Sequence, residues 1–472
     1  MNMRLTFRYV LLSVLLAGSA GCNKWLDVKP KTQVGEKDLL VDEQGFKDAL
    51  IGTYTDMGDE KLYGREFTMA LLDVLAANYD VAATSHTYNK AGLYDYVDGT
   101  VKLKLAGFWS QAYKCIANLN NLLDKIDAKK EVFNTGMYEL VKGEALALRA
   151  FLHFDMLRAF GPVPATGLDN PAIPYVTKFN MQVQPKLTTK QVVAKCMDDL
   201  KAAQGLLAMH KDVVLGHSDI FLAHTRNHMN YWAVTGLMAR VSLYGGDRQN
   251  AYAYATEVIA GGRFPWIRNI DISSIYPNRI FSYENIFALY VSNLQDINLV
   301  HFRGISATTA VLTNKAAFIN NRFEISSGGS TDIRYLHLWK TDGSSSTKYP
   351  VKYWMEDLLA SNGIYIRRVP ILRLTEMYYI AAEAAGTTLE GVRLLNTVRA
   401  NRGLQQLSES LSGDQLQTEI MKEYKKEFIQ EGQLFFYYKR TNAKVLEGTG
   451  KPGNDALYVL PLPDDEVEFN QN

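Results

Sequence analysis

Residues 229–262 read MNYWAVTGLMARVSLYGGDRQNAYAYATEVIAGG. Apolar residues recur at helical spacing on both sides of Gly245-Gly246-Asp247. This pattern predicts a helix over 229–244, a tight turn, and a second helix over 249–259. Ala251 and Ala255 supply small side chains where the two helices would face each other. The stretch therefore predicts a helical hairpin.

A second stretch repeats this layout nearer the C-terminus. Helical spacing over 373–385 and 389–399 flanks a turn at 386–388, again with small alanine side chains on the facing side. Paired helices joined by a short turn are the unit of tetratricopeptide repeats, although neither pair matches the full repeat pattern. We interpret both as degenerate tetratricopeptide-like hairpins, which stack on their neighbours into a curved scaffold.

Other segments with helical spacing extend the scaffold on both sides of these hairpins. They span 38–54, 68–77, 108–126, 138–160, 189–207 and 415–440. Segment 138–160 is apolar on most sides, which places it among other helices. After the last helix we expect a glycine loop and a short apolar strand, ALYVLPLP at 456–463.

The helical spacing fades over 263–365, where Gly, Ser, Asn and Asp become frequent. An irregular segment of this length is too long for a simple connecting loop without a function of its own. Loops on a rigid scaffold usually carry binding functions. We therefore expect a mainly α fold with a long irregular segment and a few short strands. Its parts are an N-terminal helical scaffold at 22–262, the irregular segment at 263–365 and a C-terminal helical part at 366–472.

Composition excludes some classes of protein. The 472 residues include 51 Lys and Arg and 50 Asp and Glu, so the formal net charge is +1. A protein that binds nucleic acid through the phosphate backbone usually has a basic excess, so no nucleic-acid partner is expected. Apolar residues make up 47% and charged residues 21% of the chain, which is typical of an ordinary folded protein.

The N-terminus has the pattern of a secretory signal. Arg4 and Arg8 precede the apolar run VLLSVLLA, and small residues lead to Cys22. The run is too short to span a bilayer, which takes roughly 20 residues. A Cys at this position predicts cleavage after residue 21 and acylation of Cys22, as in bacterial lipoproteins. The alternative is a plain secreted protein that has a Cys there by coincidence.

The other two cysteines are Cys115 and Cys196, both within segments of helical spacing. Export would permit a disulfide, but we expect two separate buried thiols. The sequence has no Cys-x-x-Cys pair and so gives no support for a zinc ribbon or a thioredoxin-like site.

Letter patterns that resemble catalytic or metal sites lack the required context. The glycines of 448–453 fit G-x-G-x-x-G but follow a charged helix rather than a strand, which predicts a flexible turn. His224 and His228 lie four residues apart, but Thr225 stands where a zinc protease has Glu, so a surface or capping role is favoured. We expect no catalytic residue, no metal and no cofactor.

Three glutamates recur at intervals of four residues in segment 415–440. Glu423, Glu427 and Glu431 have no accompanying base or nucleophile in this pattern. The spacing predicts a solvated helix face with weak ion pairs.

Segments in the correct order along nearly the whole chain resemble the SusD/RagB family, surface nutrient-binding lipoproteins of Bacteroidetes. The similar segments are Cys22…Trp25-Leu26-Asp27…Pro30, Trp109…Tyr113…Ile116…Asn120, Arg149-Ala150-Phe151…Phe160-Gly161-Pro162, Arg373…Glu376…Ala381…Glu383-Ala384, Leu395-Asn396…Val398-Arg399…Arg402-Gly403, Glu423…Glu427…Glu431-Gly432…Arg440 and Leu460…Pro463.

The resemblance implies a location and a role. Members of the family are lipid-anchored, palmitate-bearing proteins of the outer membrane that face the cell surface. They bind glycans, or peptides in some members, and deliver them to a SusC-like TonB-dependent transporter. They are not enzymes. Within the fold, irregular segments typically carry the ligand site, and helical repeats contact the transporter.

No motif identifies the ligand-binding residues, so the candidates follow from position in two irregular stretches. The first lies around the polar, turn-rich residues 84–99, and the second is the segment 263–365. A sugar presents apolar ring faces and a rim of hydroxyls, which tyrosine rings and polar side chains complement. The candidates are Asn78, Asp80, Tyr88, Tyr94 and Tyr96 in the first stretch, and Tyr290, Asn293 and Arg303 in the second.

Three functions compete at this point. The first is a lipid-anchored protein that binds a glycan, or a peptide, for a transporter. The second is a secreted glycoside hydrolase, whose pair of carboxylates cannot be recognised from spacing along the chain. The third is a structural adaptor of the transporter without a ligand of its own.

Overall fold

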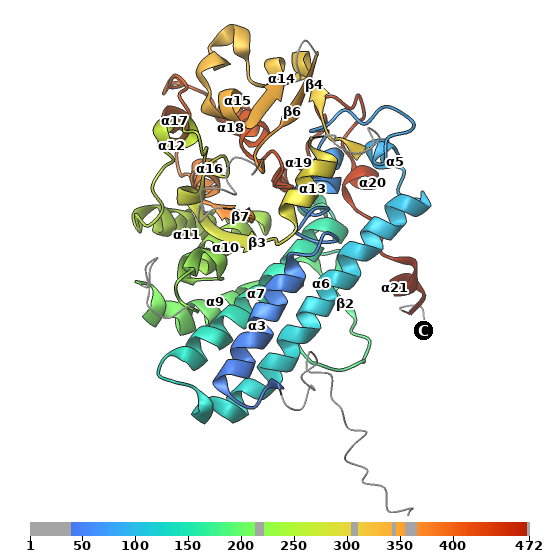
Figure 1. The fold of residues 1–472 in the computed structure, drawn as a ribbon, viewed down its shortest axis with the longest axis vertical. Helices are drawn as coiled ribbons and strands as arrows, with labels where there is room; N and C mark the ends of the chain where they lie inside the picture. Colours follow the sequence, from blue (N-terminus) through green and yellow to red (C-terminus); the bar gives the residue numbers. More distant parts are fainter. Residues whose placement is uncertain (1–38, 213–220, 304–309, 342–345, 355–365, 470–472) are drawn as a thin grey trace, which may run out of the picture.

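The computed structural model describes residues 39–212, 221–303, 310–341, 346–354 and 366–469. The predicted signal peptide and Cys22 lie outside these ranges. The long helices pack side by side in the lower half of the view in Figure 1. They are α3 (Glu43–Met57), α6 (Gly99–Ile126), α7 (Met137–Phe160) and α9 (Thr189–Leu207).

Helix α7 is the centre of this group, because it packs against both α6 and α9. Nearly all of its residues from Leu140 to Phe160 are buried, as its apolar sequence predicts. Helix α9 has the predicted bounds, and Thr188 caps it by accepting a hydrogen bond from the Gln191 backbone N–H. Cys115 and Cys196 are separate buried thiols, as expected.

The two predicted hairpins are present. They are formed by α10 (Tyr231–Tyr244) with α11 (Arg248–Ala260), and by α16 (Leu374–Ala384) with α17 (Thr388–Asn401). Helix α11 packs against α16, so the hairpins stack directly on each other. Helix α10 contacts α9, which continues the stack into the N-terminal helices. The fold is therefore mainly α and tetratricopeptide-like.

The segment 263–365, which we call the middle segment, contains more regular secondary structure than predicted. Its short elements are α12 (Asn269–Ile272), β3 (Asn285–Tyr290), α13 (Leu294–His301), β4 (Asn314–Lys315), α14 (Ala316–Arg322), α15 (Ile333–Leu338), β5 (Trp339–Thr341) and β6 (Thr347–Pro350). Strand β3 pairs antiparallel with β7 (Arg368–Arg373), and β6 lies between β4 and β5. The β3–β7 pair joins the middle segment to the C-terminal helices.

Shorter elements complete the described chain. They are α4 (Leu71–Leu75), α5 (Asn89–Gly92), the 3₁₀ helices at Asp127–Val132, Ala208–His210, Thr225–Asn227, Ser282–Glu284, Ile325–Ser327 and Gly329–Thr331, α8 (Pro164–Gly167), and the antiparallel strands β1 (Pro171–Pro174) and β2 (Lys186–Thr188). No helix within the described ranges is long and apolar enough to cross a membrane.

Two C-terminal predictions are wrong. Segment 415–440 is not one helix but two, α18 (Gly413–Glu427) and α19 (Gln433–Arg440), because Gln430 and Gly432 adopt positive φ angles of 63° and 69°. The carboxylate of Asp73 accepts the backbone N–H groups of Gln430 and Gly432 at 2.6 and 3.1 Å, which stabilises the break. The expected strand at 456–463 is replaced by α20 (Asp455–Tyr458), and α21 (Asp464–Phe469) follows.

The prediction of a solvated glutamate face in segment 415–440 is also wrong. Glu423, Glu427 and Glu431 are all buried. Glu427 forms ion pairs with Arg334 at 2.9 Å, Arg373 at 2.5 Å and Arg402 at 2.8 Å. Although burial opposes it, these guanidinium groups hold the pKa of Glu427 well below its usual range. The cluster ties the middle segment to the C-terminal helices.

Candidate functional site

A large open groove lies between one side of α3, the end of β3 and the segment that leads into α10. We call it the outer groove; its cavity volume is about 940 Å³. Its described lining residues are Gln44, Lys47, Ile51, Tyr54, Thr55, Gly58, Phe221, His224, Asn227, His228, Leu289, Tyr290 and Ser292. The groove thus combines aromatic rings with amides and hydroxyls.

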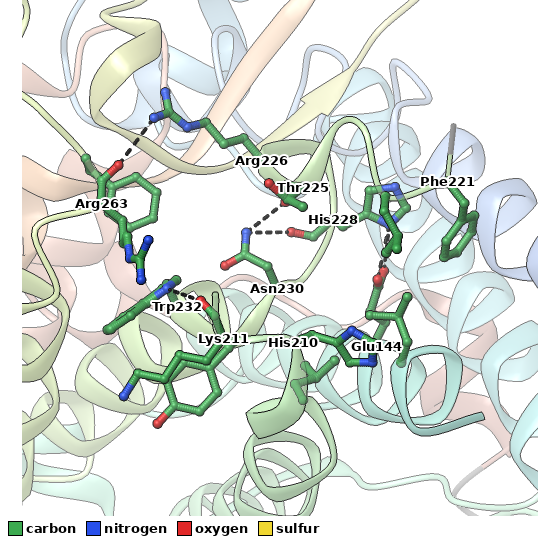
Figure 2. Close-up of a pocket in the computed structure, with 15 residues that line it drawn as sticks. Glu144, His210, Lys211, Phe221, Thr225, Arg226, His228, Asn230, Trp232 and Arg263 are labelled. Atoms are coloured by element: carbon green, nitrogen blue, oxygen red, sulfur yellow. Dashed lines mark hydrogen bonds and ion pairs between the residues drawn. The ribbon is translucent and has the colours of Figure 1, made fainter. Parts of the chain in front are cut away.

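A smaller recess adjoins the groove, and Phe221 and His228 line both. This inner hollow has a cavity volume of about 80 Å³ and is drawn in Figure 2. It is lined by Leu140, Glu144, Leu207, His210, Lys211, Phe221, Leu222, Thr225, Arg226, His228, Asn230, Tyr231, Trp232, Arg263 and Phe264. We call the two spaces together the cleft.

Three polar side chains from different elements are hydrogen-bonded at the junction of the two spaces. Tyr54 of α3 donates its hydroxyl proton to Glu144 of α7 at 2.5 Å. His228 Nδ1 lies 2.9 Å from Glu144 Oε2 (Figure 2). Although burial opposes it, the Glu144 carboxylate raises the pKa of His228. The carboxylate therefore favours a protonated imidazole at the boundary of the two spaces.

The segment before α10 is held in place by its own hydrogen bonds. The Asn230 side chain accepts from the Ala233 backbone N–H at 3.0 Å and caps α10. Its amide donates to the carbonyl oxygens of Thr225, His228 and Ile286. These bonds fix the backbone that carries His224, Asn227 and His228.

Acidic side chains are scarce among the described residues that line the cleft. Glu144 is the only acid among the described residues that line the two spaces. Cleavage of a glycosidic bond usually needs two carboxylates that flank it. In the part of the chain that the structure describes, no three His, Cys, Asp or Glu side chains gather as a metal site would require.

One predicted ligand-binding residue lines the cleft. Tyr290 is 50% exposed and belongs to the wall of the outer groove. Arg367 Nη1 donates a hydrogen bond to its hydroxyl oxygen at 3.3 Å. Asn293 lies just beyond the groove residue Ser292 and donates to Glu60 Oε1 at 2.8 Å. Arg303 lies elsewhere, with its guanidinium 4.6 Å from the ring centroid of Trp354.

Three candidates of the first stretch are buried, and each has a side-chain hydrogen bond within the protein. Asn78 Oδ1 accepts from Arg322 at 2.7 Å. The Tyr88 hydroxyl donates to Glu66 at 3.0 Å. The Tyr96 hydroxyl donates to the Leu457 carbonyl at 2.7 Å.

The two other candidates of the first stretch, Asp80 and Tyr94, line a separate hollow of about 320 Å³. Its wall also includes Lys315 and Phe318 of the middle segment. The Asp80 backbone N–H donates to the Thr313 carbonyl at 2.7 Å. The two irregular stretches therefore meet at this hollow, which is separate from the groove that Tyr290 lines.

Sequence reasoning missed most of the cleft. Tyr54 and Glu144 lie on predicted helices, where nothing distinguishes them from core residues. The HTRNH motif was the available signal, but its spacing suggested a helix face, whereas Thr225–Asn227 is a 3₁₀ turn. His228 is 8% exposed and bonded to Glu144, so it does not lie on the surface. It does stand at the C-terminal cap of this 3₁₀ turn, which is the capping alternative of the prediction.

Comparisons with known proteins agree on one family. Residues 24–243 match a SusD-like family described as "Starch-binding associating with outer membrane", and residues 319–472 match the SusD family shared with RagB. SusD-like protein P25 of Formosa agariphila is 18% identical over 281 residues, which is 58% of this chain and 50% of that protein. The chain thus spans about half the length of this curated relative.

Solved structures share the fold. A SusD superfamily protein of Bacteroides thetaiotaomicron superposes with a TM-score of 0.72 and 22% identity over 91% of this chain and 98% of the other. A SusD-like carbohydrate binding protein of Bacteroides vulgatus superposes with a TM-score of 0.71 and 19% identity over 91% and 97%. At these identities the likeness establishes the fold.

Proposed function

Because this chain belongs to the SusD/RagB family, we propose that it is a lipid-anchored outer-membrane protein that captures a glycan at the cell surface. It then delivers the glycan to a SusC-like TonB-dependent transporter. It acts as a binding protein and leaves the glycan intact.

The observation that carries this proposal is the outer groove with Tyr290 in its wall. Its volume of about 940 Å³ lies at the upper end of ordinary ligand sites. The half-exposed Tyr290 ring provides an apolar face on which a sugar ring stacks. Gln44, Thr55 and Asn227 provide hydrogen-bonding groups for hydroxyls around it.

The anchor at Cys22 is supported by the signal-like residues before it. Residues 23–38 separate Cys22 from the first described residue, and a fully extended chain of this length reaches roughly 55 Å. The tether is long enough to hold the folded part close to the membrane while its cleft stays accessible.

Glycan and peptide arrays with the purified mature protein test the proposed binding. We expect glycan retention without new reducing ends, and we expect Tyr290→Ala to weaken binding at least tenfold through lost stacking, which is worth about 0.5–1.5 kcal/mol beyond buried area. Tyr276→Ala is the matched control, because Tyr276 is also exposed but lies outside the cleft.

Each other outcome favours a different function. Retention of peptides alone identifies a peptide-binding member of the family. New reducing ends identify a hydrolase. Silence on both arrays favours a structural adaptor of the transporter.

A further inference from the structure

The inner hollow is lined by an excess of basic side chains. Lys211, Arg226 and Arg263 reach it from three different segments, and His210 and His228 add two imidazoles. Figure 2 shows Arg226 and Arg263 on the same side of the hollow. Glu144, the one acid among the described residues that line the hollow, is already engaged by Tyr54 and His228. Among these described residues, basic side chains therefore outnumber acidic ones.

Arg226 is the least compensated of these groups. Its guanidinium donates to the carbonyl oxygens of Ser282 at 2.7 Å and Arg263 at 3.4 Å. No carboxylate of the described residues forms an ion pair with it, whereas most buried cations in this protein have such a partner. Burial lowers the pKa of Arg226, which shows that its charge is costly in this place.

A second arginine strengthens the positive field. Arg368 pairs across the strands with Tyr290, the aromatic wall of the outer groove. Burial and the neighbouring Arg226 lower the pKa of Arg368 to about 10. No described carboxylate forms an ion pair with either arginine, and like charges that lie close together favour the binding of an anion.

The other basic groups have weak or exposed partners. Arg263 pairs with Asp212, whose side chain is 81% exposed, and Lys211 lies 3.7 Å from Glu257. Such exposed ion pairs contribute little, so a bound anion can replace them at small cost. The buried apolar rings of Trp232 and Phe264 also line the hollow, and a wall of low polarity strengthens the electrostatic interactions beside it.

The sizes of the two spaces indicate how a ligand divides between them. The outer groove is more than ten times as large as the inner hollow, at about 940 against 80 Å³. A recess of the smaller size has room for a few water-sized groups. It fits a substituent rather than a row of sugar rings.

We propose that the inner hollow is a subsite for an anionic substituent, a carboxylate or a sulfate ester, on a sugar held in the outer groove. This inference rests on the proposed function and adds the class of glycan: acidic polysaccharides. Arg226 and Arg263 are the principal anion-binding groups, since a guanidinium matches the geometry of both substituents.

The test compares acidic and neutral glycans on the intact mature protein. An array of neutral, uronate-bearing and sulfated polysaccharides is probed first. Calorimetric titration then compares the best acidic ligand with its carboxyl-reduced or desulfated form. We expect removal of the anionic group to weaken binding at least tenfold. Arg226→Gln and Arg263→Gln should each lose most of this discrimination and keep the affinity for the neutral form.

Arg393→Gln is the control, because Arg393 is an exposed arginine paired with Glu409 far from the cleft. Circular dichroism shows whether the Arg226→Gln variant folds. If it does not, the Arg263→Gln variant alone tests the subsite, because Arg263 is half-exposed.

Equal binding of the neutral and acidic forms of the glycan overturns the anionic subsite and leaves glycan capture intact. Failure to retain any glycan overturns both proposals.

Discussion

Glu427 is the residue on which the buried charges of the core converge, since three arginines contact it. We expect Glu427→Gln to lower the free energy of unfolding by about 3–5 kcal/mol, because it leaves buried guanidinium groups without their counter-ion. Urea unfolding followed by circular dichroism measures this. Glu409→Gln, at an exposed ion pair with Arg393, should change the free energy of unfolding far less, because solvent screens that pair. Equal losses in the two variants would contradict the structural role of Glu427.

His153 gives the fold a dependence on pH. The ring is buried, and its Nδ1 lies 2.8 Å from the Arg149 carbonyl oxygen. Its Nε2 accepts a hydrogen bond from the Val176 backbone N–H. Burial lowers its pKa from 6.5 to about 3. Below pH 6.5 the unfolded chain gains a proton that the folded chain refuses, so stability falls as the pH is lowered.

At pH 5 this effect is worth about 2 kcal/mol relative to pH 7.5. The free energy of unfolding is measured for the native protein and for the His153→Gln variant at both pH values. The comparison isolates the contribution of His153, because the other groups titrate alike in both proteins. We expect the stability difference between native protein and variant to shrink on acidification. A difference that is constant with pH would show that His153 does not carry the effect.

At the level of single residues, the sequence predicted the environment of some side chains and not of others. Cys115 and Cys196 are buried as their helical spacing predicts, and so are the hairpin alanines Ala251, Ala255 and Ala381. The glutamates of segment 415–440 are not solvated, because their partners Arg334, Arg373 and Arg402 come from three other segments. Spacing along one helix carries no information about such partners.

Among the secondary-structure elements, the break between α18 and α19 is the least expected feature. Gly432 has φ of 69°, and a Cβ there would lie 2.7 Å from the Phe67 carbonyl oxygen. We expect Gly432→Ala to destabilise the protein by at least about 2 kcal/mol through backbone strain and this contact. Thermal unfolding measures the change.

Gly205→Ala is the matched control for that variant. Gly205 is exposed within α9, and a Cβ there meets nothing within 4 Å. The substitution should stabilise the helix by about 0.5–1 kcal/mol. If both variants changed stability in the same direction, the left-handed conformation at Gly432 would not be required for the break.

The long helices and both hairpins could be predicted from the sequence, because apolar residues recur at helical spacing within each segment. The break after Glu427 could not, because it depends on Asp73, which accepts the Gln430 and Gly432 N–H groups from a distant helix. The cleft could not be predicted for the same reason: Tyr54, Glu144 and His228 meet only in the folded chain. Tyr290 could be proposed, because it lies in a segment without helical period.

For the whole molecule, the proposed role requires a lipid at the N-terminus. We expect mass spectrometry of the membrane-bound protein to find an acylated Cys22 as its first residue. Cys22→Ala should move the protein from the membrane fraction to the soluble fraction without changing its fold. A native protein with an unmodified Cys22 in the soluble fraction would contradict the anchor.

The central claim is that the cleft holds an intact glycan. A crystal structure of the mature protein with an array-selected glycan tests it most directly. We predict an uncleaved oligosaccharide in the outer groove, with one sugar ring stacked on Tyr290. A glycan bound elsewhere with the groove empty, or a cleaved product in the groove, would contradict the account.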